Sequence, residues 1–259
     1  MNILIIDTPN DATAKLPALK TIGIKSVFGY LSSINPNGPK CWTPARVKAA
    51  AAAGLRIGLV HEGWGGAPGH GGISAADGAR DGAYCRKRAA ELGAPKGACV
   101  YFACDNDFVG AQIANLVIPY FKAIRAAFGD GFYRVGVYGS GAVCAAVSGA
   151  GLADLTWEAQ SRGWTGYAGW ESKAAIVQGP CTKLEGLDVD SDVAHGDIGD
   201  FDLDPAPAAA SSDARERADA ANPPAQDQAK NAPQPPQPET PAPAGNPLER
   251  FLADIFPHK

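Results

Sequence analysis

The sequence has neither an excess of basic residues nor a long run of apolar ones. Its 259 residues include 23 Lys and Arg against 27 Asp and Glu, which gives a formal net charge of -4. Nucleic-acid binding depends on a positive patch that neutralises phosphates, so this balance argues against a nucleic-acid partner. No stretch reaches the ~18 consecutive apolar residues of a membrane span, and we expect no transmembrane segment.

The chain also lacks the features of a secretory leader. It begins with the apolar run Asn2 to Asp7, without a basic region or a small-residue cleavage site. This run is typical of a strand and not of a signal peptide. We therefore expect a cytoplasmic protein by default, or one exported by a non-classical route, and the sequence leaves the localisation open.

The six cysteines include no Cys-x-x-Cys pair, which argues against zinc-ribbon or thioredoxin-type chemistry. They are Cys41, Cys85, Cys99, Cys104, Cys144 and Cys181. We interpret them as buried free thiols, with one or two disulfides as the alternative for an exported protein. The sequence predicts no metal and no other cofactor.

Composition divides the chain into three predicted parts. Residues 205–247 hold eleven of the 21 prolines and no Ile, Leu, Val, Met, Phe, Tyr, Trp or Cys. Such a segment cannot bury enough apolar surface to offset its ordering entropy, so we expect a disordered Pro/Ala-rich linker. The folded domain then covers residues 1–204. Residues 248–259 form a short amphipathic segment, which we expect either to dock on an unknown protein partner or on the domain, or to stay disordered.

Eight short apolar runs alternate with helical stretches in the folded domain. The predicted strands are Ile3 to Asp7, Ser26 to Tyr30, Arg56 to Glu62, Ala98 to Asp105, Arg134 to Tyr138, Leu155 to Gln160, Ala174 to Gln178 and Gly186 to Asp190. Continuous apolar runs are typical of parallel strands that are covered on both faces. Helix signals lie between them, such as the N-cap pair Thr43-Pro44 and the C-terminal glycines Gly54, Gly93 and Gly129.

This alternation predicts an α/β fold, a compact (β/α)₈ TIM-like barrel. The connection from Ser161 to Lys173 leaves little room for a full helix, so we expect the later helices to be short or missing. An open doubly wound sheet is the alternative.

Polar or aromatic residues end nearly every predicted strand. They are Asp7, Tyr30, Glu62, Asp105 with Asp107, Tyr138, Gln160, Gln178, and Asp188 with Asp190. A barrel carries its working residues at the C-terminal ends of its strands, so this set predicts the site. Carboxylates that end four of eight strands bring like charges together, which raises the pKa of some and keeps an acid protonated near neutral pH.

Two features of this set are typical of a sugar-cleaving site. On an extended segment Asp105 and Asp107 point to the same side, as a general acid and a charge stabiliser for glycosidic bond cleavage require. Trp64 and Trp157 offer flat rings that stack on sugars. The alternatives are a helix cap for either aspartate, an Asx-turn for Asp7, and ordinary packing for each tryptophan.

The strand motifs resemble a bacterial glycoside-hydrolase-like domain of unknown function, which is itself similar to the family 25 lysozymes, muramidases with a TIM-like barrel. The motifs are Ile6 to Thr8, Gly29 to Leu31, Val60 to Glu62, Val100 to Asp107, Tyr133 to Gly141 and Asp188 to Asp190. The resemblance covers Ile3 to about Gly199. It implies a peptidoglycan-like glycan as substrate.

The resemblance also assigns roles to individual residues. The first-strand aspartate of the lysozymes falls on Asp7, their strand-four acidic pair on Asp105 and Asp107, and their last-strand aspartate on Asp188 or Asp190. The lysozymes carry Glu as proton donor at the second strand-four position, where this chain has Asp107, whose side chain is one methylene shorter.

We therefore predict a lysozyme-like glycosidase with Asp107 as proton donor and with Asp105, Asp7 and Asp188 or Asp190 supporting it. Glu62, Tyr30, Trp64, Tyr138, Trp157, Gln160, Gln178 and Asp190 are the predicted substrate-binding residues. The Glu-to-Asp departure motivates one alternative, an inactive carbohydrate-binding or cell-wall-binding module. The second alternative is a metal-dependent hydrolase that uses His61 and His70 with the acidic ring, although their spacing matches no standard ligand set.

Overall fold

The computed structural model describes residues 3–63 and 73–203. The predicted linker 205–247, the predicted segment 248–259, Trp64 and His70 lie outside the described residues, so the three-part organisation stays a prediction. No helix of the described part is long and apolar enough to cross a membrane.

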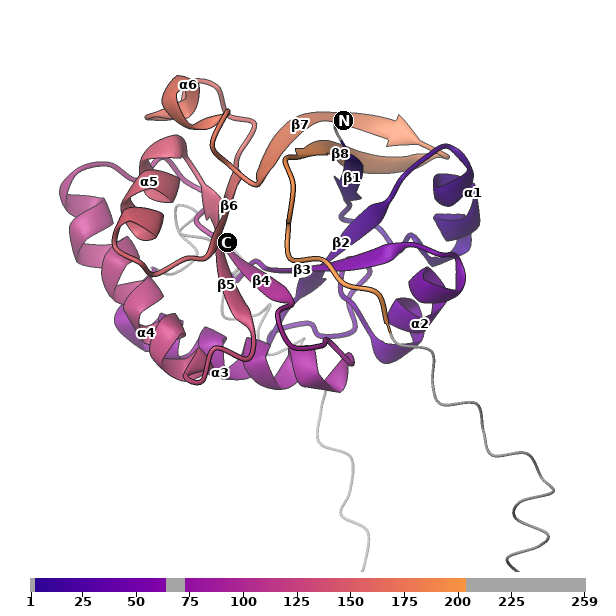
Figure 1. The fold of residues 1–259 in the computed structure, drawn as a ribbon, viewed down its shortest axis with the longest axis horizontal. Coiled ribbons are helices and arrows are strands. Elements are labelled where there is room, and N and C mark those ends of the chain that lie inside the picture. The colour runs from indigo at the N-terminus through magenta and orange to yellow at the C-terminus, as the bar shows by residue number, and fades with distance from the viewer. Residues whose placement is uncertain (1–2, 64–72, 204–259) are drawn as a thin grey trace, which may run out of the picture. The chain divides into compact units, whose positions relative to one another are not determined.

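Eight strands form a closed barrel in sequence order, which confirms the predicted barrel and rules out the open sheet (Figure 1). They are β1 (Ile3–Asp7), β2 (Ser26–Leu31), β3 (Arg56–His61), β4 (Cys99–Ala103), β5 (Arg134–Gly139), β6 (Leu155–Glu158), β7 (Ile176–Leu184) and β8 (Leu187–Ala194). Each strand from β1 to β6 is parallel to the next one, so the C-terminal ends of β1 to β6 face one end of the barrel, the mouth.

Helices cover the outside of the early strands and shrink toward the end of the chain (Figure 1). They are η1 (Thr13–Lys15), α1 (Leu16–Thr21), α2 (Pro44–Ala52), α3 (Ala75–Glu91), η2 (Ile113–Val117), α4 (Ile118–Phe128), α5 (Gly141–Gly149) and α6 (Tyr167–Trp170). The single turn of α6 and the lack of a helix between β7 and β8 confirm that the later helices are short or missing.

The predicted helix boundaries are also confirmed. The Thr43 hydroxyl accepts a hydrogen bond from the Arg46 amide at 3.3 Å, which caps α2 at its start. Gly54 and Gly93 follow α2 and α3 with φ of 74° and 79°, in the left-handed region that glycine adopts without strain.

The last strand departs from the all-parallel expectation, because β8 is antiparallel to both β7 and β1. A parallel partner needs a crossover of about a dozen residues or more, whereas β7 and β8 are joined by a turn of two residues, Glu185 and Gly186. Both have positive φ, 50° and 84°, as a tight hairpin turn requires. Because β8 starts at the mouth and runs away from it, its first residues lie there, and Asp190 is paired in register with Asp7.

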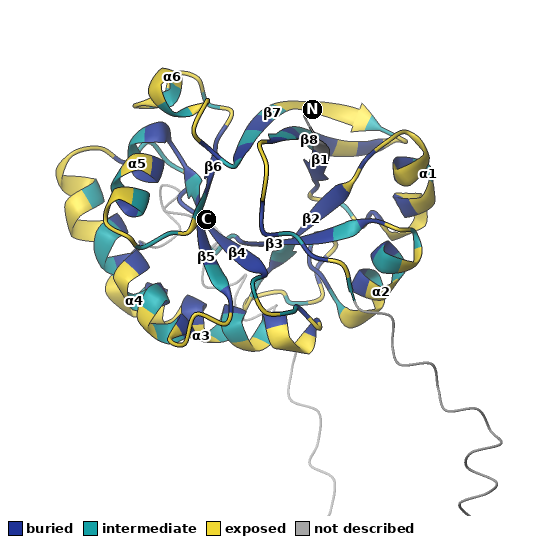
Figure 2. Cartoon of the chain, in the orientation of Figure 1, coloured by how far each residue is buried: buried dark blue, intermediate teal, exposed yellow. Residues whose placement is uncertain are grey.

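Two apolar clusters hold the barrel together, one between strands and helices and one inside the barrel. Buried positions follow the strands and the inward faces of the helices (Figure 2). Inside, the rings of Phe28, Tyr101 and Trp157 meet edge to face with centroids 5.1 to 5.9 Å apart. A Cβ on Gly58 would lie 2.4 Å from the Phe28 ring, so glycine is required there. These rings form a solid floor below the mouth.

All six cysteines are free. Five are buried, as predicted, and Cys181 on β7 is exposed.

Candidate functional site

A cavity of about 250 Å³ opens at the mouth of the barrel, above the aromatic floor. It is lined by Asp7, Tyr30, Val60, Glu62, Ala103, Asp105, Tyr138, Trp157, Gln160, Ser161, Gln178 and Asp190. Nine of these are predicted site residues, either at strand ends or aromatic. Most of the cavity wall therefore follows from the rule that a barrel gathers its strand-end side chains at one mouth. Their roles in chemistry stay predictions.

Asp7, at the end of β1, is the most deeply buried carboxyl of this wall, with 2% of its surface exposed. The Tyr30 hydroxyl donates a hydrogen bond to Asp7 Oδ1 at 2.7 Å. The Gln178 and Asp192 side chains also interact with the Asp7 carboxyl and favour its ionised form. Burial raises the pKa of Asp7 to about 7, the Tyr30 hydrogen bond opposes this rise, and the charge of Asp190 adds to it.

Asp192 is a site-adjacent carboxyl that the sequence reasoning missed. It is fully buried on β8, two residues beyond Asp190, and it interacts with Asp7. Burial holds the pKa of Asp192 well above its usual range, and the charges of Asp7 and Asp190 raise it further. Burial and these like charges therefore favour the protonated form of Asp192, which can donate its proton in a hydrogen bond to Asp7. The alternation of Asp188, Asp190 and Asp192 at every second position was the available signal.

Gln178 connects the strands on the β7 side of the cavity. Its Oε1 accepts hydrogen bonds from the Tyr138 hydroxyl at 2.8 Å and from the Gln160 amide at 3.2 Å. Its Nε2 donates to Asp190 Oδ2 at 3.0 Å. One buried amide thus fixes side chains from β5 and β8 and the backbone that follows β6.

Glu62 follows β3 and Asp105 follows β4, and both carboxyl groups line the cavity. The Lys40 ammonium contacts the Glu62 carboxylate and lies 4.2 Å from the centroid of the Tyr30 ring. Burial and the charge of Glu62 raise the pKa of Asp105, and Lys40 partly offsets this. Asp105 is nonetheless open to solvent at the mouth, where it can exchange protons.

Asp107 and Asp188 do not line the cavity. The strand β4 ends at Ala103, so Asp105 and Asp107 do not share the face that an extended segment would give them. The Asp107 carboxylate accepts hydrogen bonds from the amide and hydroxyl of Thr165 at 2.9 and 3.1 Å. Asp188 is exposed and forms an ion pair with Lys183 at 2.5 Å on the hairpin.

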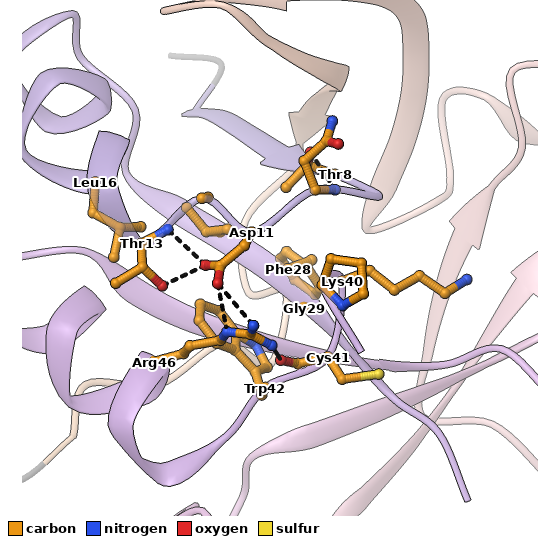
Figure 3. A pocket seen from close by; sticks show the side chains of 14 residues that line it. Thr8, Asp11, Thr13, Leu16, Phe28, Gly29, Lys40, Cys41, Trp42 and Arg46 are labelled. Carbon is orange, nitrogen blue, oxygen red and sulfur yellow. Dashed lines mark hydrogen bonds and ion pairs between the residues drawn. The ribbon is translucent and has the colours of Figure 1, made fainter. Parts of the chain in front are cut away.

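A second, much smaller cavity of about 20 Å³ lies beneath the connection from β1 to α1 (Figure 3). Asp11 accepts hydrogen bonds there from the Thr13 amide at 3.0 Å and from Arg46 Nη2 at 2.7 Å. Arg46 also donates to the carbonyl of Cys41 at 2.8 Å. These charges are paired with one another, and the arrangement fixes the loop.

His61 lies outside the mouth cavity. Its side chain is buried on the outer side of β3, with Nδ1 2.8 Å from the Leu31 carbonyl and Nε2 3.4 Å from Asp81 Oδ2. Burial alone lowers the pKa of His61, but the neighbouring Cys85 and Asp81 raise it well above its usual value. Among the described residues, no three His, Cys, Asp or Glu side chains converge as metal ligands.

Glu158 is a second buried carboxyl that the sequence reasoning missed. It ends β6 with no exposed surface, and neither of its oxygens has a hydrogen-bond partner among the described residues. Burial raises the pKa of Glu158 to about 7, with a contribution from the charge of Glu171. It points away from the cavity, because the neighbouring Trp157 points into it.

Part of this chain is similar in sequence to parts of two longer proteins. The Bacillus subtilis (strain 168) protein FadG is 30% identical over 163 residues, which is 59% of this chain and 27% of FadG. YbfG of the same strain is 35% identical over 101 residues, 36% of this chain and 14% of YbfG. Both are uncharacterized proteins, and the chain matches about a quarter of their length or less.

Solved structures share the fold. The Tat-secreted protein Rv2525c of Mycobacterium tuberculosis, in complex with L-tartrate, matches with a TM-score of 0.63 and 18% identity over 77% of this chain and 98% of that one. The modular autolysin LytC of Streptococcus pneumoniae, in complex with a synthetic peptidoglycan ligand, matches with a TM-score of 0.50 and 12% identity. That match covers 75% of this chain and 47% of LytC.

A family model confirms the resemblance that the strand motifs predicted. It is described as Rv2525c-like, glycoside hydrolase-like domain, and it matches residues 17–198, well over half of the sequence and nearly all of the barrel. The chain belongs to the Rv2525c-like glycoside hydrolase-like domain family.

Proposed function

We propose that the mouth cavity binds an amino-sugar glycan such as peptidoglycan and cleaves a glycosidic bond in it. The observation that carries this proposal is a cavity that combines four carboxyl groups with three aromatic side chains, Tyr30, Tyr138 and Trp157. Aromatic faces pack against sugar rings, and paired carboxyl groups cleave the bond between them. The family match and the peptidoglycan ligand of the structural neighbour LytC add support.

The arrangement of the strands suggests how the carboxyl groups divide the work. In a ring of eight strands, β4 and β8 lie opposite each other, so Asp105 and Asp190 approach a bound sugar from opposite sides. Glycosidic cleavage needs an acid that protonates the leaving oxygen and a carboxylate that stabilises the positive charge developing on the sugar.

We assign the acid to Asp105, whose raised pKa suits a proton donor, and the stabilising charge to Asp7 and Asp190. The proton donor predicted at Asp107 thereby moves to Asp105, because Thr165 engages the Asp107 carboxylate.

Release of reducing ends from purified peptidoglycan tests the proposal. Wild-type protein should release them, Asp105→Asn should lose at least ~100-fold in rate, and Asp107→Asn should keep most of the activity. Loss of activity in Asp107→Asn alone would return the acid role to that residue. An absence of release by the wild type would remove the catalytic proposal.

The engagement of Asp107 by Thr165 favours a second candidate, a carbohydrate-binding module without turnover. With Asp107 bound to Thr165, the segment after β4 contributes only one carboxyl group, that of Asp105, to the cavity lining. Saturable binding of glycan without release of reducing ends would identify this function. An absence of any binding would exclude both candidates.

A further inference from the structure

Glu158, the last residue of β6, is enclosed between the start of α5 and the loop after β6, residues 159–175. A Cβ on Gly141, the first residue of α5, would lie 2.9 Å from Glu158 Oε1 and 2.2 Å from the Gly166 carbonyl oxygen. The backbone of the loop therefore packs directly on α5, and α6, which belongs to this loop, lies next to α5 (Figure 1). Glu158 has no exposed surface in this closed arrangement.

The charges around Glu158 do not favour its ionised form. Neither of its carboxyl oxygens has a hydrogen-bond partner among the described residues. The ionisable groups that interact with it are the Cys144 thiol of α5 and Glu171, an exposed carboxylate after α6 with the same sign of charge. No Lys, Arg or His side chain of the described part of the chain acts on it.

The first amides of α5 are also engaged elsewhere. The Ala142 amide donates to the Thr165 carbonyl of the loop at 2.9 Å, and the Val143 amide donates to the Ser140 hydroxyl at 3.2 Å. A buried carboxylate that has neither a hydrogen bond nor a positive partner is costly. The closed loop therefore requires Glu158 to be protonated.

The loop that covers Glu158 also forms part of the mouth. Gln160 and Ser161 line the cavity, and the amide and hydroxyl of Thr165 hold the Asp107 carboxylate at 2.9 and 3.1 Å. Any displacement of the loop from α5 would therefore move the cavity wall and weaken the tie to the segment after β4.

We propose that Glu158 is a pH-sensitive switch of the mouth: its protonated form lets the loop after β6 close on α5, and loss of the proton favours the open loop. An ionised Glu158 can reach water only when the loop moves away. The switch concerns the regulation of the cavity, and its consequence for a glycan rests on the proposed function.

The sign of the pH dependence follows from the two states. Burial, together with the charge of Glu171, raises the pKa of Glu158 from 4.5 to about 7 in the closed arrangement. Between these values the closed form holds a proton that the open form releases, so each pH unit favours opening by up to about tenfold. The effect levels off above the closed-state pKa.

Hydrogen–deuterium exchange of the full chain, followed by NMR without glycan, tests the switch. The amides of Ala142 and Thr165 report on the loop, because both donate hydrogen bonds across the closed contacts. After correction for the intrinsic pH dependence of exchange, their protection should fall at least about tenfold from pH 5.5 to pH 8, relative to the amides of β3 and β4. Absence of this fall in the wild type would overturn the switch.

Three variants locate the effect. Glu158→Gln keeps the shape of the side chain but cannot ionise, so the protection of both reporter amides should change less than about twofold over this range. Glu91→Gln removes a charge from the end of α3, where Glu91 is paired with Arg88, and should behave as the wild type. Glu171→Gln removes the like charge and should make the fall smaller and let it level off at a lower pH.

The outcomes decide the inference separately from the proposed function. A fall in folded Glu158→Gln as large as in the wild type would overturn the switch. If Glu158→Gln does not fold, Glu171→Gln decides, because a fall identical to that of the wild type would also overturn it. Since exchange is measured without glycan, a failure of glycan binding and cleavage would remove the proposed function and leave the switch standing.

Discussion

The Tyr30 hydroxyl donates a hydrogen bond to Asp7 Oδ1 at 2.7 Å, and this contact opposes the effect of burial on the Asp7 carboxyl. A hydrogen bond to the charged form favours ionisation, so Tyr30 holds the pKa of Asp7 below the value that burial alone would give.

Tyr30→Phe should therefore raise the pKa of Asp7 above about 7. Any activity that requires ionised Asp7 should then have its acidic limb moved upward by about one to two pH units, since a hydrogen bond to a charged group is worth roughly 1.5 to 3 kcal/mol. The pH dependence of reducing-end release measures this shift. An unchanged acidic limb in a folded Tyr30→Phe protein would show that Asp7 does not control the activity.

Asp192 should make the folded protein less stable as the pH rises. Its folded pKa lies above the usual carboxyl value, so between the two pKa values the folded state binds more protons than the unfolded state, and the free energy of unfolding falls with increasing pH. Asp192→Asn keeps the shape but cannot ionise. Urea denaturation from pH 4 to pH 8 should show a shallower loss for the variant, by on the order of 1 to 3 kcal/mol. Parallel curves for the two proteins would contradict the shifted titration.

The buried pair of His61 and Asp81 should stabilise the link between β3 and α3 without serving the cavity. Asp81→Asn leaves the charged imidazole without its partner and should cost about 3 kcal/mol of unfolding free energy near pH 6. Tyr120→Phe, which removes only the 3.1 Å hydrogen bond to Asp81, should cost about 1 kcal/mol and serves as the matched control.

The His61–Asp81 pair should contribute to the free energy of unfolding only within a defined pH range. The pKa of Asp81 is lowered mainly through His61, against the opposing effect of burial, so the contribution of Asp81 is present above pH 3.8 and lost as the pH falls through its folded value. The raised pKa of His61 makes its contribution complete below pH 6.5 and lost as the pH rises through the folded pKa. The cost of Asp81→Asn should thus shrink at high pH, and a cost independent of pH would exclude a charged pair.

Asp107 should act by positioning a loop. Its two hydrogen bonds from Thr165 tie the segment after β4 to the loop after β6, which carries Gln160 and Ser161 of the cavity wall. Asp107→Ala and Thr165→Val should each raise KM with little change in kcat, Asp107→Ala severalfold and Thr165→Val less, because the Thr165 amide keeps its hydrogen bond. The double variant should be no worse than Asp107→Ala alone. A large loss of kcat in Asp107→Ala alone would instead indicate a direct catalytic role.

Much of this fold and of its cavity was predictable from the chain. Polar residues that follow an apolar run, such as Asp7, Glu62 or Gln178, can be assigned to the mouth from the sequence. Closure of a barrel brings the ends of its parallel strands together whatever their exact lengths. The glycines after α2 and α3 end those helices for a local steric reason, so these helix ends can also be predicted from the sequence.

The remaining features depended on tertiary geometry. The direction of β8 follows from the two-residue turn before it. Glu185 adopts a left-handed conformation in this turn, but glutamate is not a residue that predicts such a turn. The apolar pattern predicts a strand that ends at Asp190, whereas pairing with both β7 and β1 extends β8 to Ala194, and Asp192 lies in this extension. The divergence of Asp105 from Asp107 reflects the end of β4 at Ala103, set by its neighbours and not by its own residues.

The uncovered hairpin gives the barrel an uneven resistance to local opening. Val177 and Val193, paired on its outer face, are only half-buried, whereas Leu59 on β3 and Val100 on β4 are fully buried. Amide hydrogens of β7 and β8 should therefore exchange with deuterium faster than those of β3 and β4. The wall that holds Gln178 and Asp190 is then the part of the barrel that opens at the lowest free energy, and a bound glycan should slow exchange most strongly there.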